Sequence, residues 1–435
     1  MSRSRPLLAL VGGALAITAA SVGGTAYLTL RTGPLAERLV REVNALARAR
    51  HPRPSHVTPA KPGTFAEHLE PLMGEVLRLY RERPEALRDS ASEWPCLAVL
   101  EGRAPVSELP PSCLAAVEQG RELVARVLEA THAEEGGLPE GLGPLASPAH
   151  AHARDGMLAL QYVVRLAGLE TRLRLARGKA EEAVDVCLDS LALSRELAGG
   201  GLLGHMVSAA GHGALYRPCA DALDAAPWER KRSAVTQLSR LEEGLVPFSW
   251  TMKQESAAVQ LMAFGGLMSA KARASLPVGA RELATQSHGL ALAPGNPLDA
   301  RLSWRKMARV FDALVPVADL GPEARRRAFT AIEARNTGGL YPVEGPDVMA
   351  YERFAERLEL LRLQQDALRV LVEVDMHRAE TGRWPEAVPN RAAYTFVLEA
   401  PLPTEALLRP CAADLQQHGL RVTADVRSAS WVPVP

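Results

Sequence analysis

Hydrophobic and polar residues alternate with the period of an α-helix along most of this chain. In residues 155–176, Tyr162, Leu166, Leu169 and Leu173 recur at steps of four, three and four, which places them on one helix face. The same spacing predicts further helices over residues 64–83, 179–197, 202–223, 228–243, 250–274, 299–314, 322–334 and 347–381. The expected fold class is therefore mainly all-α, with a body built from helical hairpins.

Capping residues and glycines mark where several of these helices begin and end. Thr64 and Glu67 have the spacing of a capping box, which predicts a helix start at Thr64. Gly382 follows the long helix 347–381 and precedes a proline by three residues, the usual end of a helix. We expect Gly382 to have a positive φ and Trp384 to fold back onto the apolar face of that helix.

The helix predicted over residues 202–223 is unusually rich in glycine. Glycine inside a helix costs roughly 1 kcal/mol relative to alanine, so several of them require a compensating contact. Close approach of a neighbouring backbone would supply that contact. Because Gly199–Gly201 separates this helix from residues 179–197, we expect the two to pack as antiparallel neighbours at the centre of the body.

The N-terminus carries a membrane signal. Residues 6–30 contain no charged side chain and are long enough for a helix that crosses a bilayer, which takes about 20 apolar residues. The alternative is a cleaved signal peptide with an apolar region over residues 7–17. We expect an uncleaved, single-pass anchor in a bacterial inner membrane, with the body facing the periplasm and the bilayer as a partner.

Changes in composition divide the chain into four parts. Residues 1–31 are the anchor and residues 32–63 a juxtamembrane and Pro-rich linker, whose stretch 51–63 has four prolines and reads as a stiff spacer. The helical body is expected over residues 64–383, and a Gly- and Pro-rich loop at 134–150 could divide it. A small α+β C-terminal segment, 384–435, completes the chain. In it, β-branched and aromatic residues at 394–398 and 420–426 predict an antiparallel pair.

Charge and cysteine content narrow the functional classes. Fifty basic residues balance fifty acidic ones, so no global positive field favours nucleic acid. None of the five cysteines forms a C-x-x-C pair, which excludes zinc ribbons and thioredoxin-like motifs. Cys96 and Cys113 bracket a short Pro-rich stretch. They could close a disulfide in an oxidising compartment or remain two buried thiols, and both alternatives stay open.

Histidines on the glycine-rich helix resemble a metal site only superficially. His205, His212 and Cys219 recur every seven residues, so neighbouring side chains rise roughly 10 Å along the axis. One zinc ion needs donor atoms about 2.0–2.3 Å away, which a single helix with this spacing cannot provide. We interpret both histidines as neutral and hydrogen-bonded within a tight helix contact.

The other short patterns in the sequence do not indicate a functional site. His150 and His152 form an H-x-H pair near Asp155, but no third ligand is visible in the sequence. Ser303 and Lys306 match S-x-x-K without the companion motifs of penicillin-binding proteins. G-x-S-x-G and P-loop patterns are missing. The sequence therefore assigns no catalytic residue, no cofactor site and no metal ligand.

Two segments carry a resemblance to known proteins. The stretch VDMHRAETGRWPEAVP resembles the helix–Gly–aromatic–Pro element that follows the long helix in pseudopilin-like proteins. Together with LRLARGKAEEAVDVCLDSLALSREL it also resembles uncharacterised exported or membrane-anchored bacterial helical proteins with hairpins like those of tetratricopeptide repeats. True pseudopilins have a Glu shortly after the start of the mature helix, which residues 6–30 lack, so the resemblance implies a fold and an extracytoplasmic location rather than pilin assembly.

These observations favour a non-enzymatic scaffold or interaction protein of the bacterial envelope. Its partner would be another envelope protein, and nucleic acid is not expected. The alternative is an exported hydrolase whose site is assembled from distant segments. In that case Glu255, His205, His212 or Ser303 should cluster around one deep pocket, whereas an interaction protein should present an apolar groove.

Overall fold

A computed structural model describes most of the chain after the N-terminal apolar run. The described residues are 32–49, 51–87, 94–143, 145, 151–285, 297–336, 346–383, 385, 396–402, 405–410, 418–423 and 430–433. The expected anchor at 6–30 lies outside them, as do Trp384, His150 and Cys411. No helix in the described part of the chain is both long and apolar enough to span a membrane.

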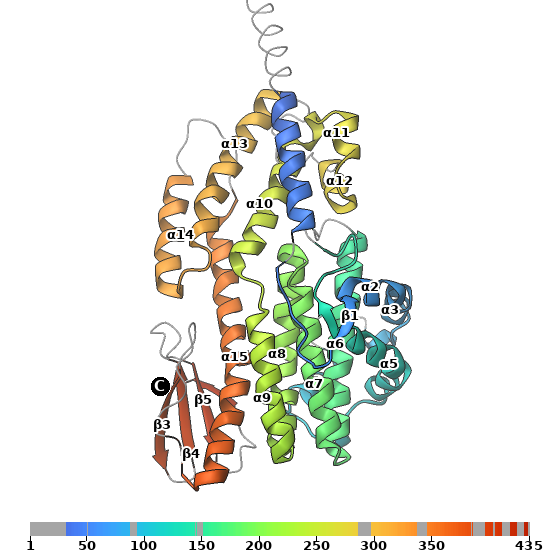
Figure 1. Cartoon of the computed structure of the whole chain (residues 1–435), viewed down its shortest axis with the longest axis vertical. Helices are drawn as coiled ribbons and strands as arrows, with labels where there is room; N and C mark the ends of the chain where they lie inside the picture. The colour runs from blue at the N-terminus through green and yellow to red at the C-terminus, as the bar shows by residue number, and fades with distance from the viewer. Residues whose placement is uncertain are drawn as a thin grey trace, which may run out of the picture.

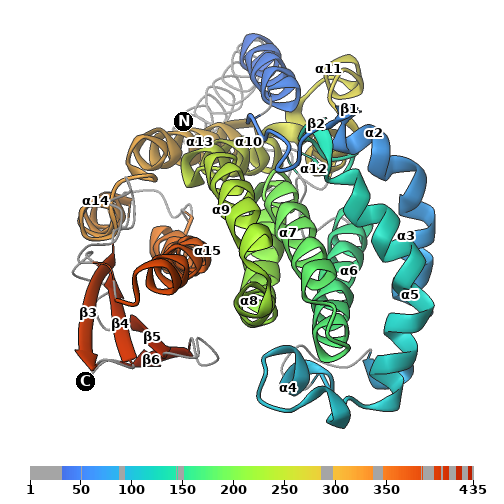
Figure 2. The ribbon, with the colours of Figure 1, turned by 60° about the horizontal axis from the view of Figure 1, so that its bottom comes forward.

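The centre of the molecule is a bundle of three consecutive helices, each of which packs against the other two (Figure 2). They are α6 (Ala151–Ala176), α7 (Ala180–Leu197) and α8 (Gly201–Ala225). Each helix is covered on more than one face, so buried residues extend around most of its circumference. The prediction of a mainly helical fold with hairpin packing is confirmed.

Glycines let α7 and α8 approach one another closely. A Cβ atom built at Gly211 would lie 2.5 Å from the Ser194 hydroxyl oxygen, and one at Gly204 would collide with the Leu197 carbonyl oxygen. At Gly204 the backbone excludes any side chain larger than hydrogen, whereas at Gly211 a side chain would force the Ser194 hydroxyl to move. The prediction that the glycine-rich helix packs centrally against the preceding helix is confirmed.

The remaining helices surround this bundle in separate groups (Figure 1). On the α6 side lie α2 (Phe65–Leu69), α3 (Met73–Arg81), α4 (Leu97–Leu100) and α5 (Pro111–Ala130), and on the α8 side lie α9 (Trp228–Glu243) and α15 (Val348–Thr381). The upper part in Figure 1 contains the helix over residues 32–48, α10 (Phe248–Phe264), α11 (Ala270–Ala274), α12 (Val278–Thr285), α13 (Pro297–Leu314) and α14 (Pro322–Asn336).

Helix boundaries follow the predicted punctuation at several places. The Thr64 hydroxyl accepts from the Glu67 amide at 3.3 Å, and the Glu67 carboxylate accepts from the Thr64 amide at 2.8 Å, which completes the capping box. Gly382 ends α15 with φ +69°, as predicted. Helix α5 was not predicted, although Pro111 stands at its first turn, where proline is well tolerated.

The C-terminal segment forms more sheet than the predicted pair. Strands β3 (Phe396–Leu402), β4 (Glu405–Pro410), β5 (His418–Thr423) and β6 (Ser430–Pro433) make a four-stranded antiparallel sheet in sequential order. Val397 pairs with Arg409, and Leu420 pairs with both Leu408 and Trp431. The two predicted strands form in part, within β3 and β5, but they do not pair with each other as predicted, because the unpredicted strand β4 lies between them.

Residues 51–63 do not act as a free spacer, which corrects the prediction. Arg53, Ser55 and His56 are buried, and β1 (Lys61–Thr64) pairs in parallel with β2 (Ala133–Glu135). Upstream, the helix over residues 32–48 contributes to a core cluster shared with α10 and α12. Proline limits backbone freedom without preventing packing, so this stretch lies across the body as an ordered segment. We call residues 51–60 the strap.

The loop predicted to divide the body is also packed into it. Leu142 and Leu145 are buried, and the Gly137 amide donates to the Glu196 carboxylate of α7 at 3.1 Å. A loop that buries leucines and hydrogen-bonds to a central helix joins the neighbouring elements. In its described part, the 134–150 segment therefore does not separate two subdomains.

Two disulfides lie in the interior of the described body. Cys96 bonds to Cys113 and links α4 to α5, which selects one of the two alternatives left open by the sequence. Cys187 bonds to Cys219 and links α7 to α8, a pairing that was not predicted. All four residues are fully buried. The second bond crosses the same contact that the glycines of α8 permit.

Substitution at Gly211 tests the tight helix contact. We expect Gly211→Leu to lower the free energy of unfolding by about 1–3 kcal/mol or more, because an overpacked contact must shift side chains or backbone. Gly213 is exposed on the same helix and is the matched control. Gly213→Ala should leave stability unchanged or raise it by up to about 1 kcal/mol through helix propensity. Urea unfolding measures both, and equal effects at the two positions would contradict the packing account.

Substitution at Gly382 tests the end of α15. A side chain there would meet no neighbouring atom, so any cost arises from the positive φ alone. Gly382→Val should therefore cost on the order of 1 kcal/mol or more, whereas Gly382→Asn should cost less because asparagine tolerates the left-handed region. Thermal unfolding of the two variants provides the comparison. Indistinguishable melting temperatures for wild type and the valine variant would show that this conformation is not required.

Candidate functional site

The two histidines of α8 lie in separate, buried surroundings. The His205 ring nitrogen Nδ1 and the Thr251 hydroxyl are hydrogen-bonded at 2.5 Å, and the ring stands edge-on to Phe248 and Phe354. Burial, followed by the charge of Arg195, lowers the pKa of His212 to about 4, so this ring is neutral at pH 7. The expectation of hydrogen bonding is confirmed for His205. It is wrong for His212, whose ring nitrogens have no hydrogen-bond partner among the described residues.

The other sequence candidates do not converge either. Cys219 forms a disulfide with Cys187, and Ser303 is buried on α13. Glu255 accepts a 3.2 Å hydrogen bond from the Tyr351 hydroxyl. His152 is exposed on α6, near Gly141. Pockets between α8 and α15, between α5 and α6, and beside Arg53 are all lined by other residues.

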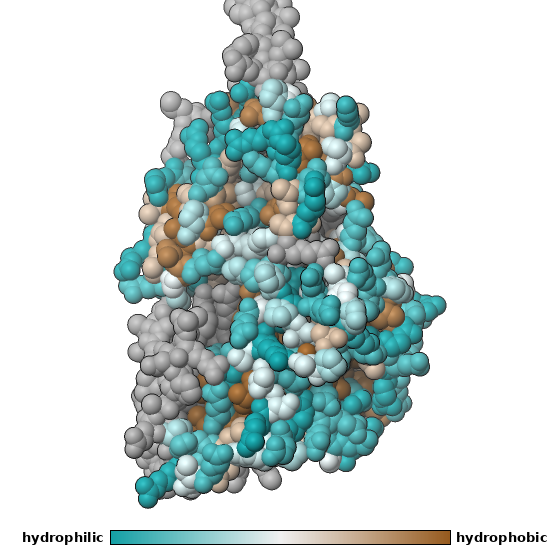
Figure 3. Space-filling model, in the orientation of Figure 1, coloured by the Kyte–Doolittle hydropathy of each residue, from teal (hydrophilic) through white to brown (hydrophobic). Residues whose placement is uncertain are grey.

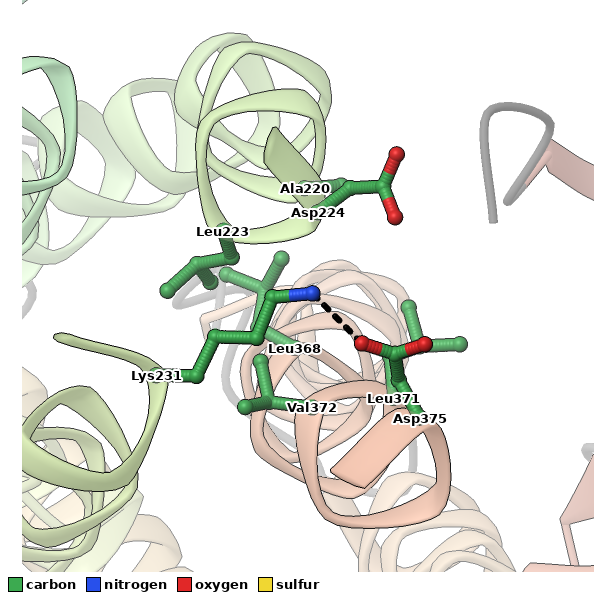
Figure 4. Close-up of a pocket in the computed structure, with 8 residues that line it drawn as sticks. All are labelled: Ala220, Leu223, Asp224, Lys231, Leu368, Leu371, Val372 and Asp375. Atoms are coloured by element: carbon green, nitrogen blue, oxygen red, sulfur yellow. Dashed lines mark hydrogen bonds and ion pairs between the residues drawn. The ribbon is translucent and has the colours of Figure 1, made fainter. Parts of the chain in front are cut away.

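The pocket between α8, α9 and α15 is mainly apolar. Its apolar lining comes from Ala220, Leu223, Leu368, Leu371 and Val372. Figure 4 shows Lys231 reaching across it to Asp375, and the two charged groups lie 2.5 Å apart. The charged residues of the lining are Lys231 and Asp375, which pair with each other, and Asp224. The pocket is a packing gap closed by an ion pair.

A polar cluster that sequence reasoning missed lies where the strap crosses the body. It consists of His56 from the strap, His132 from the turn between α5 and β2, and Asp189 from α7. Figure 1 shows the strap running over the central helices toward β1. The β1–β2 pairing begins beside both histidines, since the Lys61 amide donates to the His132 carbonyl at 2.8 Å. The cluster therefore depends on three segments that are distant in sequence.

The ring nitrogens of both histidines point at one oxygen atom. His56 Nε2 lies 2.8 Å and His132 Nε2 lies 2.9 Å from Asp189 Oδ1. The ring centroids are 5.5 Å apart, and the ring planes are inclined by 69°. The potential ligand atoms of all three residues lie within 4.8 Å of one another. Such an arrangement can bind a proton or a metal ion between the rings and the carboxylate.

Burial differs across the cluster and sets its electrostatics. His56 is fully buried, which lowers its pKa despite the opposing hydrogen bond with Asp189. The His132 side chain is 27% exposed, and its hydrogen bond with Asp189 raises its pKa above the ordinary value. For Asp189, burial favours the neutral acid, but hydrogen bonds from His132 and His56 outweigh it and lower the pKa. Asp189 is therefore ionised at neutral pH.

Charged neighbours around the cluster already have partners. Lys61 and Glu129 form an ion pair at 2.5 Å on the solvent side. Toward the interior, the Glu196 carboxylate pairs with Arg53 at 2.8 Å and with Arg195 at 3.2 Å. Burial lowers the pKa of Arg195, although the nearby Glu196 opposes the shift. The Arg53–Glu196 pair fastens the strap to α7 on the N-terminal side of His56, and the Lys61–Glu129 pair joins β1 to α5 on its C-terminal side.

A second buried charge cluster is centred on Arg369 of α15. Its fully buried guanidinium pairs with the carboxylates of Asp366 at 2.6 Å, Glu242 at 2.7 Å and Glu373 at 3.1 Å. Three carboxylates compete for one positive charge, so a proton on one of them is favourable. Burial raises the pKa of Glu242 to about 7, against the opposing effect of Arg369.

Comparison with known proteins returned no match: no protein-family model, no curated protein and no solved structure is significantly similar to this chain. The resemblance expected from the sequence therefore stays a prediction, and the functional argument depends on the chain itself.

Replacement of Glu242 tests the protonation of this carboxylate cluster. Because its folded-state pKa lies above the ordinary 4.5, the folded protein binds more protons than the unfolded chain between about pH 4.5 and 7. The resulting stability is present at acidic pH and is lost as the pH rises through this window. We expect Glu242→Gln to reduce this fall by up to about 3 kcal/mol, because glutamine resembles the protonated acid.

Chemical denaturation at pH 5, 6, 7 and 8 provides the measurement for both proteins. Histidine titrations contribute equally to wild type and variant, so the difference between the two profiles isolates Glu242. Parallel profiles would show that Glu242 titrates at its ordinary value. Glu243→Gln, at the neighbouring position on α9, is the matched control and should reproduce the wild-type profile.

Proposed function

We propose that this chain is a single-pass, membrane-anchored protein whose helical body lies outside the cytoplasm and binds another protein of the bacterial envelope. The observation that carries the proposal is the pair of buried disulfides, Cys96–Cys113 and Cys187–Cys219. Disulfides persist in oxidising compartments such as the periplasm and are rare in the reducing cytosol. They support an extracytoplasmic body independently of the N-terminal apolar run.

The position of the helix over residues 32–48 supports direct attachment of the body to its anchor. Ala36, Leu39 and Val43 are buried in a core shared with α10 and α12. An anchor that ends near residue 31 would therefore hold the body at the membrane surface through a packed helix. Such attachment suits a protein that presents a fixed face to a neighbour in the envelope.

Surface composition indicates what kind of partner interface to expect. The face in Figure 3 is mostly hydrophilic, with apolar residues in small separate patches. The large apolar residues exposed among the described residues, Met206, Val278 and Leu320, come from different elements of the body. We therefore expect a polar, ion-pair-rich interface in place of the apolar groove that the sequence led us to expect.

The alternative of an exported hydrolase receives no specific support from its expected residues. His205 contacts Thr251, Glu255 contacts Tyr351, and His212 is enclosed between the central helices without a hydrogen-bond partner among the described residues. A hydrolytic site would require these groups to face a common cavity. We therefore retain the interaction protein as the proposal.

Export and disulfide state provide the first test. Residues 1–60 fused to a reporter that is active only after export should give membrane-associated activity. In cells that produce the full chain, thiol-blocking before and after reduction should show that four of the five cysteines become reactive only after reduction. Four free thiols and a reporter active only in the cytosol would contradict the proposed location.

Partner binding requires a separate test with the full chain. Amine-reactive cross-linking in intact cells, followed by purification in detergent, should yield one stoichiometric heterologous adduct. Charge reversal at exposed arginines, such as Arg327→Glu on α14, should reduce the adduct if the interface includes that surface. A chain recovered only as uncross-linked monomer would contradict an interaction role while leaving the location intact.

A further inference from the structure

We propose that His56, His132 and Asp189 form a binding site for one divalent transition-metal ion of the zinc class. Two imidazole nitrogens and one carboxylate are ligands that such ions accept, and three protein ligands leave a position for water. The ligands are Nε2 of each histidine and a carboxylate oxygen of Asp189. The proposal concerns binding and does not depend on the proposed interaction role.

The present distances are close to those a bound ion requires. Tetrahedral zinc with bonds of about 2.0–2.1 Å separates its ligand atoms by roughly 3.3 Å. The nitrogen–oxygen distances from Asp189 are 2.8 Å to His56 and 2.9 Å to His132. An ion that replaces the two N–H protons would need the ligands to move apart by about 0.5 Å, which side-chain rotation can supply.

The solvent exposure of the ligand side chains predicts a metal ion that solvent can reach, rather than one enclosed in the protein. His56 is fully buried, whereas the side chains of His132 and Asp189 are 27% and 18% exposed. Solvent therefore reaches the cluster at His132 and Asp189 and not at His56, so a water ligand and the entry path would lie on the side of the first two. The ionised Asp189 supplies negative charge at the cluster, and the nearby cations Lys61 and Arg195 are paired with Glu129 and Glu196.

The surroundings also limit the expected affinity. Metal-bound histidines usually donate their other ring N–H to a carbonyl or carboxylate. His56 Nδ1 is buried and has no hydrogen-bond partner among the described residues. Loss of such a partner typically costs 10–100-fold in affinity. We therefore expect micromolar binding, weaker than that of a structural zinc site.

Binding would connect three segments of the chain. The ion would tie the strap to α7 and to the turn after α5, at the place where these segments already meet through hydrogen bonds. A ligand that binds only the folded state stabilises it by RT ln(1 + [L]/Kd), so the melting temperature should rise with the metal concentration. The same atoms without a metal would remain a hydrogen-bonded cluster, and this is the competing account.

The test uses the full chain, purified in detergent without a histidine tag and stripped of metal by a chelator. Titration with Zn²⁺, followed by calorimetry, should give one equivalent bound and a higher melting temperature. His132→Gln should weaken binding at least tenfold. His152→Gln, which removes an exposed histidine of the H-x-H pair, is the matched control and should bind like wild type.

X-ray absorption of the zinc-loaded wild-type protein gives a readout that does not depend on any variant folding. Two imidazole nitrogens and oxygen ligands at about 2.0–2.2 Å would support the site. No stoichiometric binding, a sulfur-containing shell, or equal affinity for wild type and His132→Gln would overturn it. If His152→Gln, and not His132→Gln, lost the ion, the metal would belong to the H-x-H pair and the proposal would be wrong.

Discussion

The close contact between α7 and α8 is the constraint on which the rest of the structure depends. Gly204 and Gly211 remove the side chains that would keep the two backbones apart, and Cys187–Cys219 joins the helices covalently across the same contact. Together with α6, which contacts both of them, these helices form the central bundle against which the outer helices pack. An increase in the distance between α7 and α8 would displace α9, α10 and α15 together, because each of them contacts α7 or α8.

Buried ion pairs join the strap to the central bundle and join outer helices to one another. Glu196 of α7 holds Arg53 of the strap, Glu352 of α15 holds Arg325 of α14, and Glu242 of α9 holds Arg369 of α15. A buried ion pair gains little net free energy, but removal of one partner leaves an uncompensated charge that costs several kcal/mol. We infer that these pairs favour one docking position over nearby alternatives in which a charge would be unpaired.

The sequence predicted the features that depend on residues close together along the chain. Helix α9 has its predicted bounds, Gly382 has its predicted conformation, and Thr64 forms its predicted cap, because periodicity and capping are local properties. The disulfide between Cys187 and Cys219 and the burial of the strap depend on tertiary packing, which periodicity does not encode. Proline-rich composition suggested a spacer, but composition cannot show that Arg53 and His56 have partners on α7.

The polar cluster is the clearest example of a feature that local sequence patterns do not predict. His56, His132 and Asp189 belong to a loop, a turn and a helix, so no short motif contains two of them. The H-x-H pair at 150–152 is the more conspicuous signal in the sequence. His152, however, is exposed and does not belong to the cluster. The one local hint was His56 itself, an ionisable residue within a Pro-rich stretch.

The strap explains why this cluster matters for the molecule as a whole. It connects the helix over residues 32–48 to β1, and it is held by Arg53 against Glu196 and by His56 against Asp189. Both acids belong to α7, one of the two helices of the central contact. The strap is therefore fixed to the core by two polar contacts, one to each of these acids. Whatever occupies the histidine–aspartate cluster, whether protons or a metal ion, would set how firmly that segment is held.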